Sequence, residues 1–177
     1  FEPDRSVSRE EIATLLTRQR KLSGVDVTAD KNEVSAFVDS AKISSWAVDG
    51  VAYCTKSGLV KGNPGKVFAP AGNTTRAELA TMAYRFAAWA GIDVSASDAA
   101  YYLTQDTGLI DRPNNAFSYA RSALIWTCDT GVLNGKYDTE GFAWLDAQYT
   151  ATRGEAAKIF SVLKRDVVDR SGSYTVS

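Results

Sequence analysis

The sequence predicts a mainly α-helical fold of repeated helix–turn–helix units, with little or no β-strand. Three stretches have a hydroxyl residue, an arginine, a variable residue and a glutamate in that order, and apolar residues at helical spacing follow each of them. The arginines of these stretches are Arg9, Arg76 and Arg153, so the intervals between them are 67 and 77 residues. Recurrence at long and similar intervals is the sequence signature of stacked structural units.

Other features recur in the same order and strengthen the case for a repeat. An apolar helical pattern begins at an aromatic residue followed by alanine, and it ends in a turn that contains two glycines. A glycine followed by an aliphatic residue and an aspartate comes after the motif helix in two of the units. The corresponding features are Trp46 and Tyr119, the turns 58–62 and 131–135, and Gly24 and Gly91.

We therefore divide the chain into a partial repeat one (residues 1–27), repeat two (28–94) and repeat three (95–177), which ends in a C-terminal tail. Each full repeat is expected to contain a helix, a glycine-containing turn, a short extended piece and a second helix. Segments 28–42 and 95–118 are expected to add a short helix or a loop. Repeat one lacks its own first helix, and the start of the chain is interpreted as a processed or trimmed end.

The motif places Glu three residues after Ser or Thr, which is the signature of a capping box at a helix start. The hydroxyl accepts a backbone N–H bond and the carboxylate reaches back to the capping residue, a cap worth about 1 kcal/mol. This structural role needs no ligand. The three predicted pairs are Ser8 with Glu11, Thr75 with Glu78, and Thr152 with Glu155.

Two interpretations of the motif arginines stay open. A helix start presents backbone N–H groups and partial positive charge, and an adjacent guanidinium adds a planar donor fork suited to a carboxylate or a phosphate. Arg9, Arg76 and Arg153 could therefore form local anion sites. Alternatively, each arginine is a surface or interfacial side chain paired with a neighbouring acid, and its recurrence preserves a contact of the fold.

The aromatic residues and glycines of the repeat also have two interpretations each. Trp46 and Tyr119 either offer a flat apolar face to a sugar ring or pack in the core between repeats. Gly62 and Gly135 either permit a backbone turn or let a ligand approach the main chain closely. Residue types alone do not decide between these alternatives.

Composition excludes several classes of function. The 20 basic and 21 acidic residues nearly balance, which gives no general attraction to nucleic acid. There is no histidine, which removes His-dependent nucleophilic catalysis and His-ligated zinc. The sequence shows no pair of acids placed for glycoside hydrolysis, so we expect no enzyme activity, no cofactor and no metal. No stretch approaches the roughly 18 apolar residues of a membrane helix.

The two cysteines, Cys54 and Cys128, are too few for a four-thiolate metal site. They either form one disulfide in an oxidising compartment or are two small buried residues. The separation and orientation of the two side chains decide between these alternatives.

The ordered features of repeat two resemble the S-layer homology repeat. That repeat has a helix that begins near Trp-Ala, a glycine-bounded turn, a Phe-x-Pro step and an Ile-Thr-Arg-Ala-Glu helix start. Repeat three resembles it less, because Tyr119 replaces the tryptophan, Gly154 stands in the motif and the Phe-x-Pro step is missing. Repeat one keeps only its second half. The matching residues of repeat two are Phe37-Val38-Asp39, Trp46-Ala47, Gly58-Leu59-Val60-Lys61-Gly62, Phe68-Ala69-Pro70 and Thr75-Arg76-Ala77-Glu78.

The resemblance implies a three-pronged spindle with a central helix bundle and with grooves between repeats. It implies a non-catalytic module of a bacterial, extracellular cell-surface protein that binds an anionic secondary cell-wall polysaccharide, often with pyruvylated sugars. The arginines would hold the pyruvyl carboxylate, the aromatic residues would line a groove, and the aspartate would hydrogen-bond sugar hydroxyls or orient an arginine. The residues concerned are Arg9, Arg76, Arg153, Trp46, Tyr119 and Asp39.

A different class of function stays open. A chain that lacks the first helix of repeat one would expose an apolar groove that a partner element could fill. The degenerate repeats would then mediate protein–protein assembly, with a protein partner or with a second copy of the chain.

Overall fold

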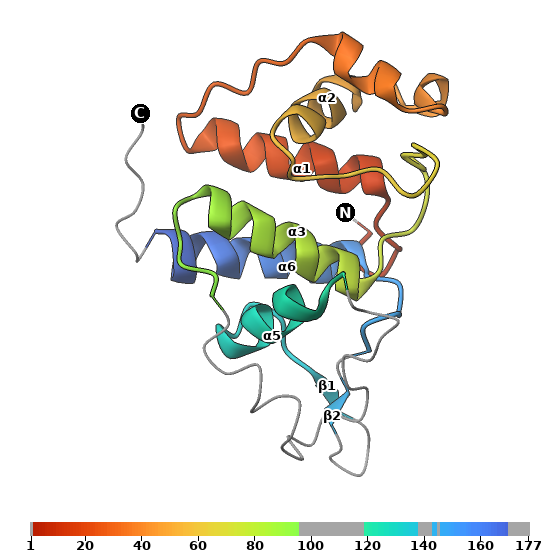
Figure 1. The fold of residues 1–177 in the computed structure, drawn as a ribbon. Coiled ribbons are helices and arrows are strands. Elements are labelled where there is room, and N and C mark those ends of the chain that lie inside the picture. The colour runs from red at the N-terminus through yellow and green to blue at the C-terminus, as the bar shows by residue number, and fades with distance from the viewer. Residues whose placement is uncertain (1, 96–118, 138–142, 145, 170–177) are drawn as a thin grey trace. The chain divides into compact units, whose positions relative to one another are not determined.

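The computed structural model describes residues 2–95, 119–137, 143–144 and 146–169, and these are mainly helical, as the sequence predicts (Figure 1). The only strands in these ranges are two residues long each, and they pair antiparallel. The elements are α1 (Arg9–Leu22), the 3-10 helices η1 (Lys31–Ala36) and η2 (Ser40–Lys42), α2 (Val48–Lys56), α3 (Arg76–Trp89), α5 (Arg121–Asp129), β1 (Lys136–Tyr137), β2 (Ala143–Trp144), α6 (Arg153–Val162) and the π-helical η4 (Leu163–Val168).

The described residues form two compact units. The N-terminal unit contains the residues from Arg5 to Thr74, and the C-terminal unit contains those from Thr75 onward together with residues 2–4. Each unit therefore combines the motif helix of one repeat with the first helix and turn of the next repeat. The compact units are offset from the sequence repeats by about half a repeat.

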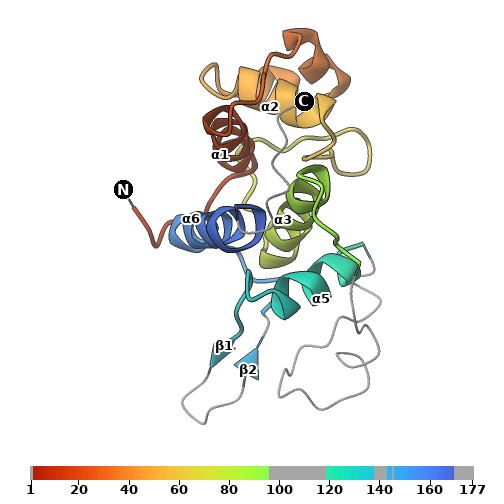
Figure 2. The same ribbon diagram turned by 90° about the vertical axis from the view of Figure 1, so that its left-hand side faces the viewer.

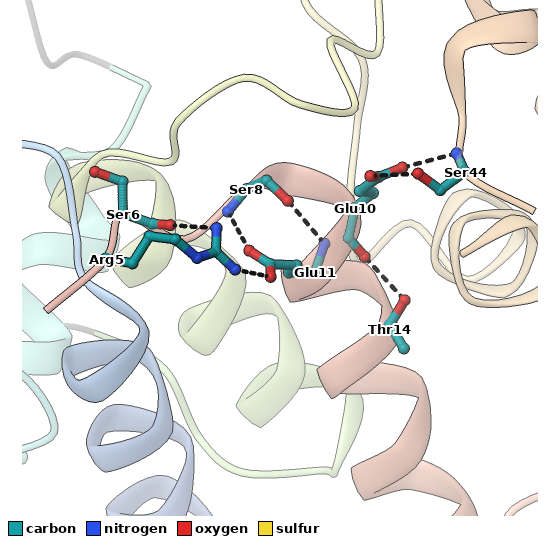
Figure 3. A network of polar contacts seen from close by, with 7 residues as sticks. All are labelled: Arg5, Ser6, Ser8, Glu10, Glu11, Thr14 and Ser44. Carbon is teal, nitrogen blue, oxygen red and sulfur yellow. Dashed lines mark hydrogen bonds and ion pairs between the residues drawn. The ribbon is translucent and has the colours of Figure 1, made fainter. Parts of the chain in front are cut away.

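The three motif helices begin at the residues that the capping signature indicates. Ser8, Thr75 and Thr152 each take an extended N-cap conformation, and each forms the reciprocal capping box with the glutamate three residues later. In the first box, shown in Figure 3, Ser8 N donates to Glu11 Oε2 over 2.9 Å and Glu11 N donates to Ser8 Oγ over 3.4 Å. Such a box satisfies two backbone donors that a bare helix start leaves unpaired.

The ends of α1 and α3 are equally alike. Gly24 and Gly91 have φ angles of 80° and 82°, in the left-handed region that favours glycine. The following residue then turns back, because Val25 N donates to Arg20 O over 3.2 Å and Ile92 N donates to Ala87 O over 3.0 Å. These glycines end the helices, so the correspondence between repeats one and two extends through the whole motif helix.

In the N-terminal unit, α1 packs closely against α2 (Figure 1). Gly50 makes this approach possible, because a Cβ atom there would lie 3.0 Å from the Cα of Thr14. Thr17 Oγ1 donates to Gly50 O over 3.2 Å, which ties the two helices at the same level. Ile12 and Leu16 of α1 are fully buried. Segment 28–42 contributes η1 and η2, as expected for a short helical insertion.

In the C-terminal unit, α3 contacts α5, α6 and η4 (Figure 2). Phe86 of α3 and Phe160 of α6 are buried, and Tyr84 meets Trp126 of α5 edge-on with ring centroids 5.9 Å apart. Aromatic pairs favour this geometry. Segment 96–118, for which the sequence predicted a short helix or loop, lies outside the described residues.

The residue before each N-cap is buried, which generates a stability prediction. Val7 and Ala151 are apolar at this position, whereas Thr74 is fully buried and its hydroxyl has no hydrogen-bond partner within the described residues. A buried hydroxyl without a partner costs about 1–3 kcal/mol. We expect Thr74→Val to raise the melting temperature by about 2–4 °C, measured by calorimetry.

Thr75→Val is the control, because it removes the N-cap of α3 and should lower the melting temperature. A lower melting temperature for Thr74→Val would mean that the Thr74 hydroxyl makes a favourable contact in solution.

Candidate functional site

The Arg9 side chain is almost completely buried, with 4% of its surface exposed. Its Nε donates to Phe68 O over 2.7 Å, and its Nη2 donates to Lys61 O over 2.8 Å. The guanidinium carbon lies 5.6 Å from the centroid of the Phe68 ring, within the range of a cation–π contact. These contacts join the start of α1 to the turn that follows α2.

Arg76 repeats this arrangement in the C-terminal unit. It is 3% exposed, its Nη2 donates to Asn134 O over 2.8 Å, and its Nη1 forms an ion pair with Glu155 Oε1 over 2.8 Å. Asn134 occupies the position in its turn that Lys61 occupies in the turn of repeat two, because each directly precedes the second glycine. The motif arginine of one repeat therefore holds the same carbonyl of the next repeat in both places.

The backbone N–H groups at the motif helix starts are also used within the protein. In all three helices, the N–H of the second helical residue donates to a carbonyl of a loop, and in α1 and α3 the first residue does the same. The prediction that these N–H groups are open to an anion is wrong, because loop carbonyls occupy them. The bonds are Arg9 N–Gly72 O 3.1 Å, Glu10 N–Pro70 O 3.1 Å, Arg76 N–Tyr149 O 3.0 Å, Ala77 N–Ala147 O 2.9 Å and Gly154 N–Pro3 O 2.9 Å.

Of the two interpretations of the motif arginine, the fold contact describes Arg9 and Arg76 as the structure places them. The acceptors are mainly backbone carbonyls, which the sequence does not reveal, and Glu155 is the one acid among the contacts described above. Arg153 is half-buried at the start of α6. Direct contact of these arginines with a sugar acid stays a prediction.

Asp39 fixes the loop to which Arg9 binds. Its two carboxylate oxygens accept from Phe68 N and from Ala69 N, both over 2.8 Å. Partial burial works to raise the pKa of Asp39, but these two backbone hydrogen bonds outweigh it and hold the pKa below its ordinary value. Asp39 and Arg9 therefore bond to the same loop segment, because Phe68 O accepts from Arg9. The role of Asp39 toward a sugar hydroxyl or toward the arginine stays a prediction.

Gly62 and Gly135 follow the held carbonyls. A Cβ atom on Gly62 would lie 2.7 Å from the Phe37 ring, so the absence of a side chain there lets Phe37 pack against the turn and against Phe68, 5.2 Å away between ring centroids. Gly135 is half-buried. The left-handed backbone of each turn is instead at its first glycine, Gly58 or Gly131, with φ angles of 71° and 69°.

Trp46 and Tyr119 point outward in the structure. They are 56% and 60% exposed, and each precedes an alanine that is fully buried at the start of its helix. The interpretation of these two aromatic residues as core packing is therefore wrong. Two equivalent positions present a large aromatic surface to solvent, which is the property that contact with a sugar ring requires.

The Glu10–Ser44 contact was missed by the sequence analysis. The Glu10 side chain is largely buried, and its carboxylate accepts from Ser44 N over 2.9 Å and from Ser44 Oγ over 2.8 Å (Figure 3). This contact fixes the segment that leads to Trp46. The sequence held one signal of this contact. The variable position of the motif is a glutamate only in the first motif, and it is Ala77 or Gly154 in the other two.

The cysteines are not joined in a disulfide. Cys54 is buried between α1 and α2, where its thiol donates to Ala13 O over 3.3 Å, and burial raises its pKa to about 12. Cys128 is half-buried. In the described part of the chain, no three His, Cys, Asp or Glu side chains are grouped so that they could hold a metal ion. None of the described helices combines the length and apolar character needed to cross a membrane.

Comparison with known proteins identifies the repeat that carries most of these features. Residues 36–80 match the S-layer homology domain, so this segment is an S-layer homology domain, and the resemblance drawn from its residues is confirmed. Domains of this class are non-catalytic anchoring domains. The match includes Asp39, Trp46, the turn 58–62 and the start of α3.

Several known proteins are similar over about half of the chain. A cellulosome-anchoring protein of Acetivibrio thermocellus is 38% identical over 87 residues, which are 49% of this chain and 19% of that protein. Cell surface glycoprotein 1 of the same organism is 36% identical over 86 residues, 49% of this chain and 4% of that protein. An amylopullulanase of Thermoanaerobacterium thermosulfurigenes is 40% identical over 85 residues, 46% of this chain and 4% of that protein. The chain spans less than a fifth of each of these relatives.

The buried ion pair predicts a large loss of stability on removal of Arg76. Arg76→Ala would remove the Arg76 donors from Glu155 Oε1 and from the Asn134 carbonyl, and breaking such a pair costs about 3–5 kcal/mol. We expect urea unfolding to show a loss near the lower end of this range, because the Glu155 side chain is 23% exposed. The exposed Lys158→Ala in α6 is the control and should change stability little. An Arg76→Ala protein of unchanged stability that no longer binds a wall polymer would restore the direct ligand role.

The lowered pKa of Asp39 predicts a pH-dependent contribution to stability. A carboxyl group with a lower pKa in the folded state stabilises the fold above its unfolded pKa, about 3.9, and loses that contribution as pH falls through the folded value. We expect wild type to exceed Asp39→Asn in free energy of unfolding at pH 7, and the difference to shrink below about pH 4. Urea titrations at several pH values measure this difference. A difference that stays constant to pH 2 would contradict the charge-dependent role.

Proposed function

We propose that this chain is a non-catalytic module that anchors a larger extracellular protein to the bacterial cell wall by binding an anionic secondary cell-wall polysaccharide. The observation that carries the proposal is the S-layer homology domain at residues 36–80. Its similarity to a cellulosome-anchoring protein and to a cell surface glycoprotein supports the cell-surface location. Pyruvylated sugars are the ligand class that the family resemblance implies.

The exposed aromatic residues support contact with a sugar ring. Trp46 lies inside the S-layer homology domain and is 56% exposed, and Tyr119 holds the equivalent position in repeat three. A flat apolar ring exposed to solvent can stack on the apolar face of a sugar. Glu10 fixes the segment that carries Trp46 through Ser44, so this ring is held on an ordered backbone.

The arginines contribute to this function by holding the turns. Arg9 and Arg76 are buried and bind the carbonyls of Lys61 and Asn134, so they fix the loops around the exposed residues. A polymer that meets these loops would then bind a preorganised surface, and preorganisation lowers the entropy cost of binding.

A second candidate function is protein–protein assembly. Leu22 at the end of α1 is 84% exposed and Val38 is 74% exposed, so both apolar side chains are accessible to a protein partner. Light scattering over a range of concentrations distinguishes the two functions. A monomer with full wall affinity favours anchoring, whereas self-association that Leu22→Ser abolishes favours assembly.

Binding to cell-wall sacculi tests the anchoring function. Sacculi of Acetivibrio thermocellus that retain their polysaccharide should co-sediment the protein, and sacculi stripped of it with hydrofluoric acid should not. We expect Trp46→Ala to weaken binding by about tenfold, or about 1.4 kcal/mol, because the variant loses apolar area that the ring would bury against the sugar. Equal retention by intact and stripped sacculi would contradict a polysaccharide ligand.

Trp89→Ala is the matched control. Trp89 is also partly exposed, at 40%, but it ends α3 and is not equivalent to Trp46 in the repeat. Its replacement should leave retention unchanged. An equal loss for both tryptophan variants would show that exposed aromatic area in general, and not the Trp46 position, governs binding.

A further inference from the structure

The turn at residues 61–66, which we call the basic turn, presents two lysines to solvent. Lys61 and Lys66 are both exposed, and no carboxylate of the described residues pairs with either of them. All residues between them are exposed as well. The basic turn lies inside the S-layer homology domain.

The backbone of the basic turn is anchored at both ends. The carbonyl of Lys61 accepts from Arg9 Nη2 over 2.8 Å, and the carbonyl of Lys66 accepts from Val38 N over 3.0 Å. Asn63 N donates to Val67 O over 2.8 Å, which closes the turn on itself. Because the two carbonyls are held by the protein, the lysine side chains extend from a fixed backbone into solvent.

Lys66 takes a backbone conformation that a lysine rarely adopts. Its φ is 58°, in the left-handed region that costs a residue with a side chain roughly 1–2 kcal/mol. Glycine would avoid this cost, and Gly65 directly precedes it with a φ of 78°. Lys66 therefore stands here at a conformational cost, and residues in strained conformations concentrate at functional sites.

The sequence around the basic turn is positively charged, and its counterpart in repeat three is not. From residue 50 to residue 77 the chain has four basic residues and no acidic residue. The corresponding stretch of repeat three, residues 123–154, has two basic and four acidic residues, and Asn134 stands in place of Lys61. The two repeats therefore use the same arginine contact to hold turns of different charge.

We propose that Lys61 and Lys66 of the basic turn pair with the acid groups of the wall polymer, so that repeat two and not repeat three supplies the charge-dependent part of binding. This inference rests on the proposed anchoring function. Arg9 is a positioning residue in it, because it acts through the Lys61 carbonyl. The chain as a whole has a net charge of −1, so a local cluster is required for attraction to an anionic polymer.

Exchanging the turn residues between repeats tests this inference in the full chain. Lys61→Asn places the repeat-three residue in repeat two, and its affinity for intact Acetivibrio thermocellus sacculi should fall about three- to fivefold at low salt. The double variant Lys61→Asn/Lys66→Asn should lose more, and its affinity should depend less steeply on NaCl concentration, since salt screens exposed charge pairs. Asn134→Lys should not restore binding to the double variant.

Lys21→Asn is the matched control, because it removes one exposed positive charge from the same unit. Lys21 lies twelve residues after Arg9 in α1, about 18 Å along the helix. Its replacement should leave the affinity and its salt dependence unchanged. An equal loss for Lys21→Asn and Lys61→Asn would assign the effect to net charge and overturn the inference.

The outcomes separate this inference from the anchoring function. If wild type does not bind intact sacculi, both fail. If wild type binds and the double lysine variant binds equally well with the same salt dependence, the anchoring function stands and this inference fails. Both lysines are exposed and make no described side-chain contact, so Lys61→Asn should leave the melting temperature unchanged. Lys66→Asn should not lower it, because Asn tolerates the left-handed backbone of this position better than Lys does. Loss of folding would therefore not explain weaker binding.

Discussion

The structure depends on a buried guanidinium group that joins the first and the second motif helix to the turn of the next repeat. A charge with about 3–4% of its residue surface exposed is stable only if its donors are satisfied. Arg9 and Arg76 meet this requirement with the carbonyls of Lys61 and Asn134, which hold the same place in the two turns. The planar, always charged donor fork of arginine suits several fixed acceptors at once, and lysine does not reproduce it.

This contact explains the offset between sequence repeats and compact units. Arg9 and Arg76 reach forward into the following repeat, and the first backbone N–H groups of the same two helices donate to carbonyls of that repeat's loop. In α6 the equivalent acceptor is Pro3, which precedes Arg9 as Pro70 precedes Arg76. The third motif helix therefore bonds to the chain segment before the first motif helix, within the C-terminal unit.

The repeats are alike in what they bury and differ in what they expose. The capping box is common to all three repeats, and the held carbonyl and the left-handed glycine of the turn are common to repeats two and three. The repeats differ at two exposed positions. Repeat two has Trp46 and Lys61 there, and repeat three has Tyr119 and Asn134. The buried features are restrained by internal contacts, because each of them touches several other parts of the protein. The exposed positions face solvent, where a substitution changes recognition at little cost in stability.

The sequence by itself determined the helical class, the helix starts and ends, and the family of residues 36–80, because these depend on local patterns. A capping box involves residues three apart, and a glycine at a helix end involves one turn of backbone. Only the tertiary structure decided the state of Arg9, since its acceptors are carbonyls 52 and 59 residues away that any residue type could supply. Likewise, only the fold decided that Trp46 faces solvent, because an aromatic residue at helical spacing fits either side until the packing partner of its helix is known.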